Sequence, residues 1–453
     1  MPSPRDASES NSRIARDWRS LLCLALILAA GTEFVVRGPL RAVQSSTQFN
    51  DFLSPYIQAD AWTRGLDPYS PRTLLRLWPA QAAHLQFVPR EVADGSIIAK
   101  RGIPTAYPIT SLVLIAPLSW LPWNLAYGLW FAINLALFGV MLSVLVELAG
   151  FSYRDIRGGL LLALVLALAP FHTGFVTANV ALAAVELGVI AVWTARQRHE
   201  IATAVLLALS AGLKPQIGLC FLLYYLVCRR WRIFAGAAAL LALFAGVGLL
   251  RLEVSHTAWF GNYLNDNHVL LESGVLANFT PVNPMRFGLL NLQVILYSIV
   301  GSASEANRLA ELIGVIFLVA WLVVVSRRRS DQDELELLDL SAIAVISLLP
   351  VYHRFYDAVL LVLPLCWVVA SYRKARLPAI LALLLMAPFL IPGGTILQTM
   401  QVNGRIPSTL SERWWWDTIV MPHEIWALFF LSLLLLYETA VHRQFENDHR
   451  VGL

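Results

Sequence analysis

Residues 125–148 read LAYGLWFAINLALFGVMLSVLVEL, an apolar stretch in which Glu147 is the only charged side chain. A helix rises about 1.5 Å per residue, so roughly 20 apolar residues cross a bilayer core of about 30 Å. Comparable apolar runs recur from Ser20 to Thr439. A helix also satisfies its own backbone hydrogen bonds within lipid. The sequence therefore predicts an all-α polytopic membrane protein, located in the cell membrane and surrounded by membrane lipids.

The composition of the whole chain supports this fold class. Of the 453 residues, 57% are hydrophobic and 14% are charged, and the mean hydropathy is +0.62. Soluble domains carry about 25% charged residues, so this chain has too few charges to cover a water-soluble surface. The composition argues against a soluble globular protein.

Lysine and arginine concentrate in short segments beside the apolar runs. By the positive-inside rule these segments face the cytoplasm, which places both termini inside and the long loops outside. Because the clusters adjoin apolar runs, they indicate topology, and we predict no nucleic-acid partner. The clusters are Arg13, Arg16 and Arg19; Arg196 and Arg198; Arg229, Arg230 and Arg232; Arg327, Arg328 and Arg329; and Arg373, Lys374 and Arg376.

This orientation divides the chain into three parts. Residues 1–19 form a cytoplasmic N-terminal tail, 20–440 a transmembrane domain and 441–453 a cytoplasmic C-terminal tail. We expect about 10 to 13 transmembrane helices, given the number of apolar runs. Three long extracytoplasmic loops follow from the alternation of these helices, and they are residues 37–106, 251–291 and 395–417.

The topology has one internal conflict. Arg154 and Arg157 indicate that the segment from Phe151 to Gly158 is cytoplasmic. Simple alternation from the first helix instead places this segment outside. Two apolar segments are also broken, at Pro170 and at Pro215, and interrupted helices at membrane depth are tolerated where they line a cavity.

The sequence contains no pattern typical of a metal or nucleotide site. No glycine-rich phosphate loop, zinc spacing or Ser-His-Asp spacing is present. The cysteines lie in or beside apolar runs, where they are interpreted as small buried apolar residues. We therefore predict no metal and no cofactor. The cysteines are Cys23, Cys220, Cys228 and Cys366.

Two charged residues have both a functional and a structural interpretation. Asp51 follows the first helix, where a carboxylate can act as a general base for an acceptor hydroxyl. The structural alternative is an N-cap for the segment that begins at Phe52. Lys214 is a cation inside an apolar stretch, where a lipid phosphate is a natural partner. Its alternative is a side chain that extends to the membrane surface.

A third group lies at the tip of a predicted helical hairpin. His353, Arg354, Tyr356 and Asp357 crowd this tip, and we interpret them as candidate lining of an active site. His353 and Arg354 are placed near a phosphate or an acceptor. In the alternative interpretation, Arg354 and Asp357 simply pair across one helical turn.

Several of these residues belong to an ordered series of short motifs. The series comprises Asp51 and Tyr56, Gly65-Leu66-Asp67-Pro68-Tyr69, Tyr107-Pro108, Leu121-Pro122, Leu129-Trp130, Thr177-Ala178-Asn179, Gly212-Leu213-Lys214-Pro215-Gln216 and His353-Arg354-Phe355-Tyr356-Asp357. It resembles the polyprenyl-phosphate-mannose-dependent glycosyltransferases of the GT-C fold, family 87, over roughly Asp51 to Leu365. The family's Gly-Gln-x-Asn element is present only as Thr177-Ala178-Asn179, and the proline after Lys214 is displaced.

The resemblance implies a GT-C bundle that transfers a hexose, with mannose expected, from a polyprenyl-phosphate donor to an outer-leaflet or periplasmic lipid or glycan acceptor, with inversion. It implies that Asp51 is the catalytic base. The substrate-binding residues it implies are Lys214, His353, Arg354, Tyr356, Asp357, Tyr56, Asn179 and Tyr107. Two other functions stay open: a lipid or solute transporter or flippase, and a ligase that uses a lipid-linked glycan.

Overall fold

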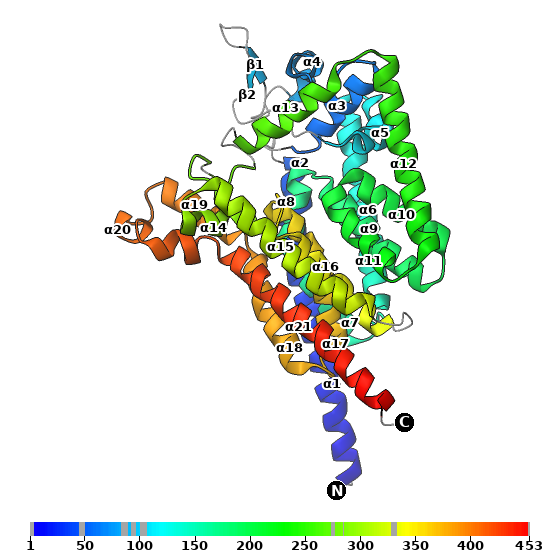
Figure 1. Cartoon of the computed structure of the whole chain (residues 1–453). Helices are drawn as coiled ribbons and strands as arrows, with labels where there is room; N and C mark the ends of the chain where they lie inside the picture. Colours follow the sequence, from blue (N-terminus) through cyan, green and yellow to red (C-terminus); the bar gives the residue numbers. More distant parts are fainter. Residues whose placement is uncertain are drawn as a thin grey trace.

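Helices make up nearly all of the computed structural model of this chain (Figure 1). The structure describes residues 4–44, 50–82, 89–91, 97–99, 107–272, 277–283, 285–327 and 333–451. Within these ranges the only strands are β1 (Pro89–Glu91) and β2 (Ile97–Ala99), an antiparallel pair that aligns Arg90 with Ile98. This pair of strands lies within the first predicted outer loop, residues 37–106.

The helices are numbered in chain order, and η marks short 3₁₀ or π segments. Up to residue 148 they are α1 (Pro4–Val35), η1 (Val36–Leu40), α2 (Arg41–Gln44), α3 (Leu53–Thr63), α4 (Pro71–Leu77), η2 (Ala80–Ala82), α5 (Ile109–Ser119) and α6 (Trp123–Leu148). Then follow α7 (Ile156–Ala167), α8 (Ala169–Thr177), α9 (Ala181–Arg196), α10 (Glu200–Leu213), α11 (Pro215–Val227), α12 (Trp231–Val254) and α13 (Trp259–Glu272). The rest are η3 (Arg286–Gly288), α14 (Gln293–Val300), α15 (Ala303–Ser326), α16 (Asp333–Ser347), η4 (Phe355–Leu361), α17 (Val362–Ser371), α18 (Arg376–Met386), η5 (Ala387–Leu390), α19 (Gly393–Val402), α20 (Ser408–Ser411), η6 (Trp416–Val420) and α21 (His423–Val451).

Six helices among the described residues are long and apolar enough to cross a membrane. A seventh span results if α7 and α8, which are bent by 49° at their junction, count as one. The all-α polytopic class that the sequence predicts is confirmed. Four further apolar helices are shorter, and the predicted total of about 10 to 13 spans stays a prediction. The long spans are Trp18–Gln44, Trp123–Leu148, Trp231–Val254, Ala303–Ser326, Arg376–Val402 and His423–Val441, and the shorter helices are Ile109–Ser119, Glu200–Leu213, Pro215–Val227 and Phe355–Ser371.

One end of the bundle, called here the terminal end, holds both chain termini (Figure 1). Cys23, near the start of the first span, donates a hydrogen bond of 3.5 Å to the carbonyl of Ile156. Arg196 at the end of α9 pairs with Glu336 at the start of α16 (2.8 Å) and donates to the carbonyl of Leu148. The segment from 151 to 158 therefore lies at the terminal end, as its arginines indicate.

The conflict with simple alternation is explained by α5, which does not cross the bundle. The hydroxyl of Ser111 donates to the carbonyls of Gly212 and Leu213, 2.9 and 2.8 Å away, where α10 ends. At the other end of α5, the hydroxyl of Tyr56 donates to the carbonyl of Leu121 (2.8 Å). Because α3 packs along α5, both lie at the opposite end of the bundle. The apolar run of α5, at 11 residues, is too short for a full crossing.

The opposite end, called here the loop end, is where the three long loops touch one another. Arg251 at the top of α12 donates to the carbonyl of Thr63 in the first loop (2.8 Å). Arg286 in the second loop forms a 2.6 Å ion pair with Asp417 in the third. These contacts bring loops that are distant in sequence to the same end, and Figure 1 shows α3, α4, α5 and α13 gathered there.

Helices α10 and α11 form a hairpin that turns at the loop end. A Cβ atom on Gly218 would lie only 2.2 Å from the backbone nitrogen of Ala211. The two backbones therefore approach closely only because residue 218 is glycine. Pro215 is the first residue of α11, a position at which a missing N–H costs nothing. The break in the apolar segment at Lys214 is thus a tight turn between two half-length helices.

Helix α13 packs on the first loop through polar and aromatic contacts. The amide of Asn262 donates to Asp67 (2.5 Å), and the rings of Tyr263 and Tyr69 lie 5.0 Å apart. Asp266, one turn further on, is only 5% exposed, and neither of its carboxylate oxygens has a hydrogen-bond partner among the residues that the structure describes. Burial and the nearby charge of Asp67 raise the pKa of Asp266 to about 7.

This raised pKa predicts that docking of α13 depends on pH. The docked state holds a proton on Asp266 that a detached helix would release, so docking is fully stabilised at low pH. It is lost as the pH rises through about 7. Hydrogen–deuterium exchange of α13 amides, corrected for intrinsic rates, should therefore be faster at pH 8 than at pH 5.5. Asp266→Asn cannot ionise and should abolish the difference, whereas Asp60→Asn should preserve it. Equal protection at both pH values in the parent would contradict the assignment.

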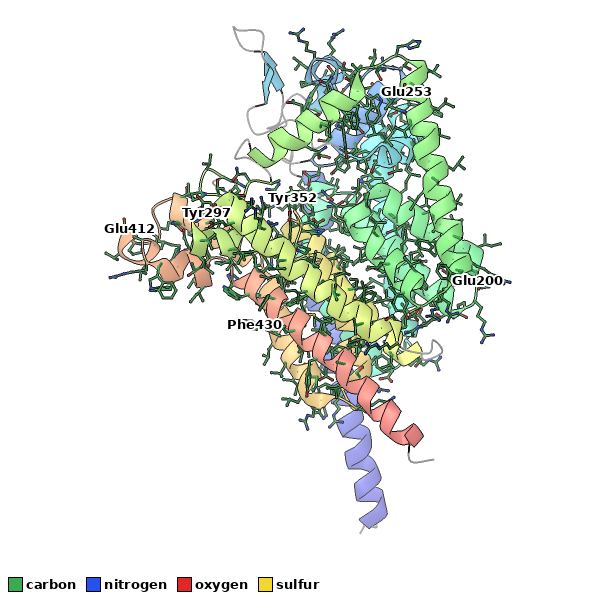
Figure 2. All side chains as sticks on the ribbon, in the orientation of Figure 1. Glu200, Glu253, Tyr297, Tyr352, Glu412 and Phe430 are labelled. Carbon is green, nitrogen blue, oxygen red and sulfur yellow. The ribbon has the colours of Figure 1, made fainter. Side chains whose placement is uncertain are left out.

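A second prediction concerns the orientation of the two ends. Figure 2 shows Glu253 at the loop end and Glu200 at the terminal end. Positive-inside placement predicts that Glu253→Cys and Glu412→Cys react with a membrane-impermeant maleimide in intact cells. Gln197→Cys should react only after permeabilisation. Background labelling should be low because Cys23, Cys220 and Cys366 are buried and Cys228 is half-buried. The reverse labelling pattern would invert the topology.

Candidate active site

Four segments of chain meet near the loop end and place most of the predicted site residues in one polar network. Asp51 precedes α3, Asn179 follows α8, and Lys214 lies in the turn between α10 and α11. His353 and Asp357 come from the turn that leads into η4. Figure 2 places Tyr352, at the same turn, between the levels of Glu253 and Glu200. Lys214, His353 and Asp357 are buried, so the network lies inside the bundle.

Asp51 is half-buried and is held by the end of α8. Its backbone N–H donates to the carbonyl of Thr177 (2.7 Å), and its carboxylate accepts a 2.8 Å hydrogen bond from the side-chain amide of Asn179. The side-chain oxygen that meets the start of α3 belongs instead to Asn50, which accepts from the N–H of Phe52 (3.1 Å). The N-cap interpretation of Asp51 is therefore wrong, and its carboxylate is directed toward the network.

Asn179 is positioned by a strained turn. Ala178 has a φ of 53°, a left-handed conformation that costs about 1–2 kcal/mol for a residue with a Cβ. The indole N–H of Trp130 donates to the carbonyl of Ala178 (3.0 Å), and its ring stacks on Phe52, 4.9 Å away. Trp130 thus holds Ala178, which precedes Asn179, and Phe52, which follows Asp51. Its only signal in the sequence was its place in the Leu129-Trp130 pair of the motif series.

Lys214 is buried and paired inside the bundle. Its ammonium forms an ion pair with Asp357, lies 3.5 Å from the side-chain oxygen of Asn179 and sits 5.1 Å from the ring centre of Tyr356. The side chain is 9% exposed and that of Asp357 is 1% exposed. The alternative in which Lys214 extends to the membrane surface is therefore wrong.

Asp357 collects three hydrogen-bond donors at the tip of the hairpin. Besides Lys214, it accepts from the N–H of Arg354 (3.0 Å) and contacts Nδ1 of His353 (3.1 Å). His353 is fully buried beside Asp357, and within the described part of the chain its Nε2 atom has no hydrogen-bond partner. Asp357 therefore forms the ion pair with Lys214, and His353 holds Asp357 in place through its Nδ1 atom.

The Arg354 side chain is half-buried and forms no ion pair with any residue that the structure describes. The alternative pairing of Arg354 with Asp357 involves only the backbone N–H of Arg354. Burial alone would lower the pKa of the guanidinium, but Tyr352, Tyr356 and the carboxylates of Asp51 and Asp357 outweigh it and raise this pKa. Arg354 therefore stays charged beside Asp51, and Tyr352 is a neighbour that the sequence-based site did not include.

Two further predicted site residues, Tyr56 and Tyr107, make contacts within the loop end. Tyr56 packs its ring 5.2 Å from that of Trp123 and donates to the carbonyl of Leu121. Tyr107 offers its carbonyl to the hydroxyl of Tyr69, 2.8 Å away. Their contacts hold the loop end together, and a role for them in substrate binding stays a prediction.

No group of three or more His, Cys, Asp or Glu side chains in the described part of the chain is arranged to hold a metal ion. The charges of the network instead come from two cations, Lys214 and Arg354, and two carboxylates, Asp51 and Asp357. A site of this kind can accept a proton at one point and bind an anion at another.

Comparison with known proteins decides the family. The pattern of glycosyltransferase family 87 matches residues 105–351, which is more than half of the chain. The chain belongs to glycosyltransferase family 87. No curated protein and no solved structure matches it significantly.

The protein is therefore a membrane glycosyltransferase, and this family membership favours the enzyme over the transporter or flippase alternative. The match is narrower than the resemblance noted in the sequence, because it begins after Asp51 and ends before His353. Asn179 and Lys214 lie inside the matched region. The candidate site thus joins residues of the family pattern with residues on either side of it.

The ion pair at the centre of this glycosyltransferase makes a prediction about stability. Breaking a buried pair leaves one charge uncompensated and costs about 3–5 kcal/mol. Asp357→Asn should show this loss, while Lys214→Met combined with Asp357→Asn should cost clearly less because neither charge remains. Arg64→Met, which breaks the exposed pair with Asp60, should cost about 1 kcal/mol or less. Reversible unfolding in mixed micelles measures each value. A double variant as unstable as the sum of the single variants would contradict the pairing.

Proposed function

We propose that this glycosyltransferase moves a hexose, with mannose expected, from a polyprenyl-phosphate donor to a lipid or glycan acceptor on the extracytoplasmic side. The observation that carries the proposal is the network in which the Asp51 carboxylate and the Lys214 ammonium are bridged by Asn179, with Arg354 beside them. Such a site provides a base and a cation within one recess of a membrane bundle. A lipid-linked donor can reach this recess from the surrounding membrane lipids.

Asp51 is the proposed general base. It removes the proton of an acceptor hydroxyl, whose oxygen then forms a bond to C1 of the hexose. The bond between C1 and the phosphate oxygen breaks on the opposite face, so the configuration at C1 is inverted. Polyprenyl phosphate leaves, and the proton remains on Asp51 until solvent takes it. Half-burial of Asp51 fits this role, because a substrate can still approach a carboxylate oriented by Asn179.

Arg354 is the proposed main cation for the donor phosphate, with Lys214 as a second contact. A cation stabilises a departing phosphate more strongly in a dry site than in water. Arg354 has no ion pair among the described residues, whereas Asp357 already offsets the charge of Lys214. Tyr356, beside Lys214, can line the sugar. His353 and Asp357 act through Lys214 and Arg354 because both are buried behind them.

The most direct test of the function is lipid and glycan profiling of cells that lack the gene. Loss of one hexose from an envelope lipid or glycan, together with accumulation of its polyprenyl-phosphate donor, is expected. Loss of an entire oligosaccharide from its acceptor would instead favour a ligase that uses a lipid-linked glycan. An unchanged profile would count against both.

Asp51→Asn should lower turnover by about 10²–10⁴-fold, the usual effect of losing a general base, while donor binding stays near that of the parent. The fold should persist because Asn50, not Asp51, bonds the start of α3. Transfer of radiolabelled hexose from a short-chain polyprenyl phosphate is measured in membranes of the deletion cells, which supply the acceptor. Asp60→Asn, in the same loop, is the matched control and should transfer normally. Near-normal transfer by Asp51→Asn would rule out this mechanism.

Arg354→Met should weaken binding of a short-chain polyprenyl-phosphate hexose by about tenfold or more, the value of one charge-assisted hydrogen bond. Lys214→Met should have a smaller effect because its charge is already offset, and Lys214→Arg should retain part of the affinity. Calorimetry in nanodiscs measures the three constants. Arg64→Met removes an exposed cation of the first loop and serves as the control. If both Met variants bind like the parent, the phosphate lies elsewhere.

A further inference from the structure

The side chain of Asn179 separates an ammonium group from the proposed base. Its Nδ2 donates to Asp51 (2.8 Å), while its Oδ1 faces Lys214 (3.5 Å). The same Oδ1 accepts a 2.9 Å hydrogen bond from the backbone N–H of Ala181. Since a backbone N–H can only donate, this bond fixes which end of the amide is oxygen. The amide therefore presents a donor to the carboxylate and an acceptor to the cation.

The charge of Lys214 is taken up on its other side by Asp357. That carboxylate is held in place by Nδ1 of His353 (3.1 Å) and the N–H of Arg354 (3.0 Å). Both partners of the pair are almost fully buried, so little water screens them. The order of groups is thus Asp51, Asn179, Lys214 and Asp357, which alternates an anion, a neutral amide, a cation and an anion.

We propose that Asn179 and Asp357 are positioning residues that keep Lys214 from pairing with Asp51 and so preserve Asp51 as a base. This inference rests on the proposed function, in which Asp51 takes the acceptor proton. A direct ion pair with Lys214 would stabilise the ionised carboxylate and make it a weaker base. It would also occupy the oxygen that must meet the acceptor hydroxyl. Asp357 holds the ammonium away, and Asn179 fills the space between.

The arrangement has a measurable electrostatic consequence. In Asp357→Asn, Lys214 retains its positive charge, and its nearest remaining carboxylate along the network is Asp51. Loss of the Asp357 carboxylate leaves the charge of Lys214 uncompensated, and in a medium of effective dielectric near 20 the resulting shift of the titration is on the order of one pH unit. The positive charge favours the ionised form of Asp51. The acidic limb of the pH–rate profile should therefore move to lower pH, and the plateau rate should fall because the base is weaker.

The experiment uses the full chain in deletion-cell membranes, with a radiolabelled short-chain polyprenyl-phosphate mannose as the donor. The pH dependence of kcat/KM is measured between pH 4 and pH 9 for the parent and for Asp357→Asn. We expect the acidic limb of the variant to lie about one unit lower. Lys214→Met combined with Asp357→Asn removes both charges of the pair. Its acidic limb should return to the position of the parent limb, even if its rate stays low through weaker donor binding.

These outcomes separate a positioning role from a merely structural one. Loss of packing lowers the rate at every pH but does not move the limb in opposite directions in the single and double variants. An unmoved limb in Asp357→Asn, or an equal shift in the double variant, would overturn the inference while leaving Asp51 as the base. Failure of the parent to transfer from any polyprenyl-phosphate hexose, or normal transfer by Asp51→Asn, would instead overturn the proposed function.

Discussion

The buried ion pair between Lys214 and Asp357 is the constraint on which the rest of the site depends. A single charge at this depth would cost several kcal/mol, so each partner requires the other. The pair joins the α10–α11 turn to the start of η4, two segments that are 143 residues apart. It also explains why the apolar segment breaks at Lys214. The tight turn, made possible by Gly218, places the ammonium at the inner surface of the bundle.

Around this pair, the network is arranged so that opposite charges alternate and no described carboxylate in it lacks a donor. The Asp357 carboxylate accepts hydrogen bonds from Lys214, His353 and the N–H of Arg354, and the Asp51 carboxylate accepts one from Asn179. Trp130 maintains the strained conformation at Ala178 through a hydrogen bond to its carbonyl. The Trp130 ring also stacks on Phe52, the residue that follows Asp51. Strain of this kind persists only where surrounding contacts determine the conformation. The aromatic packing under the site therefore supports its polar geometry.

The loop end encloses this network with elements that do not cross the membrane. Short helices α3 and α5 lie side by side, and α13 packs on the loop that follows α3 through the contacts of Asn262 with Asp67 and of Tyr263 with Tyr69. The family pattern spans residues 105–351, so the candidate base and the tip of the hairpin come from outside the part that identifies the enzyme. Recognition of the family and assembly of the site thus depend on partly different residues.

The sequence by itself determined the fold class, because apolar length and the shortage of charge are sufficient to require a helical membrane bundle. It also indicated Lys214, because a cation is costly in an apolar segment and marks a site. Asp51 and Asp357 were indicated by their places in a loop and at a hairpin tip, and Asn179 by the motif series that resembles the family. Only the tertiary structure decided which of these meet. Lys214 pairs with Asp357 and does not extend to the membrane surface. The side chain that accepts a hydrogen bond at the start of α3 is that of Asn50 and not that of Asp51.

The structure also shows that α5 ends before it crosses the bundle. The physical reason is the distance along the chain over which each kind of interaction acts. Hydrophobic length acts locally along the chain and can be read from consecutive residues, whereas an ion pair or a hydrogen bond depends on atoms within about 3 Å. Those atoms come from segments more than one hundred residues apart, as in the bonds from Asn179 to Asp51 and from Lys214 to Asp357. Packing of the whole bundle is what brings them together.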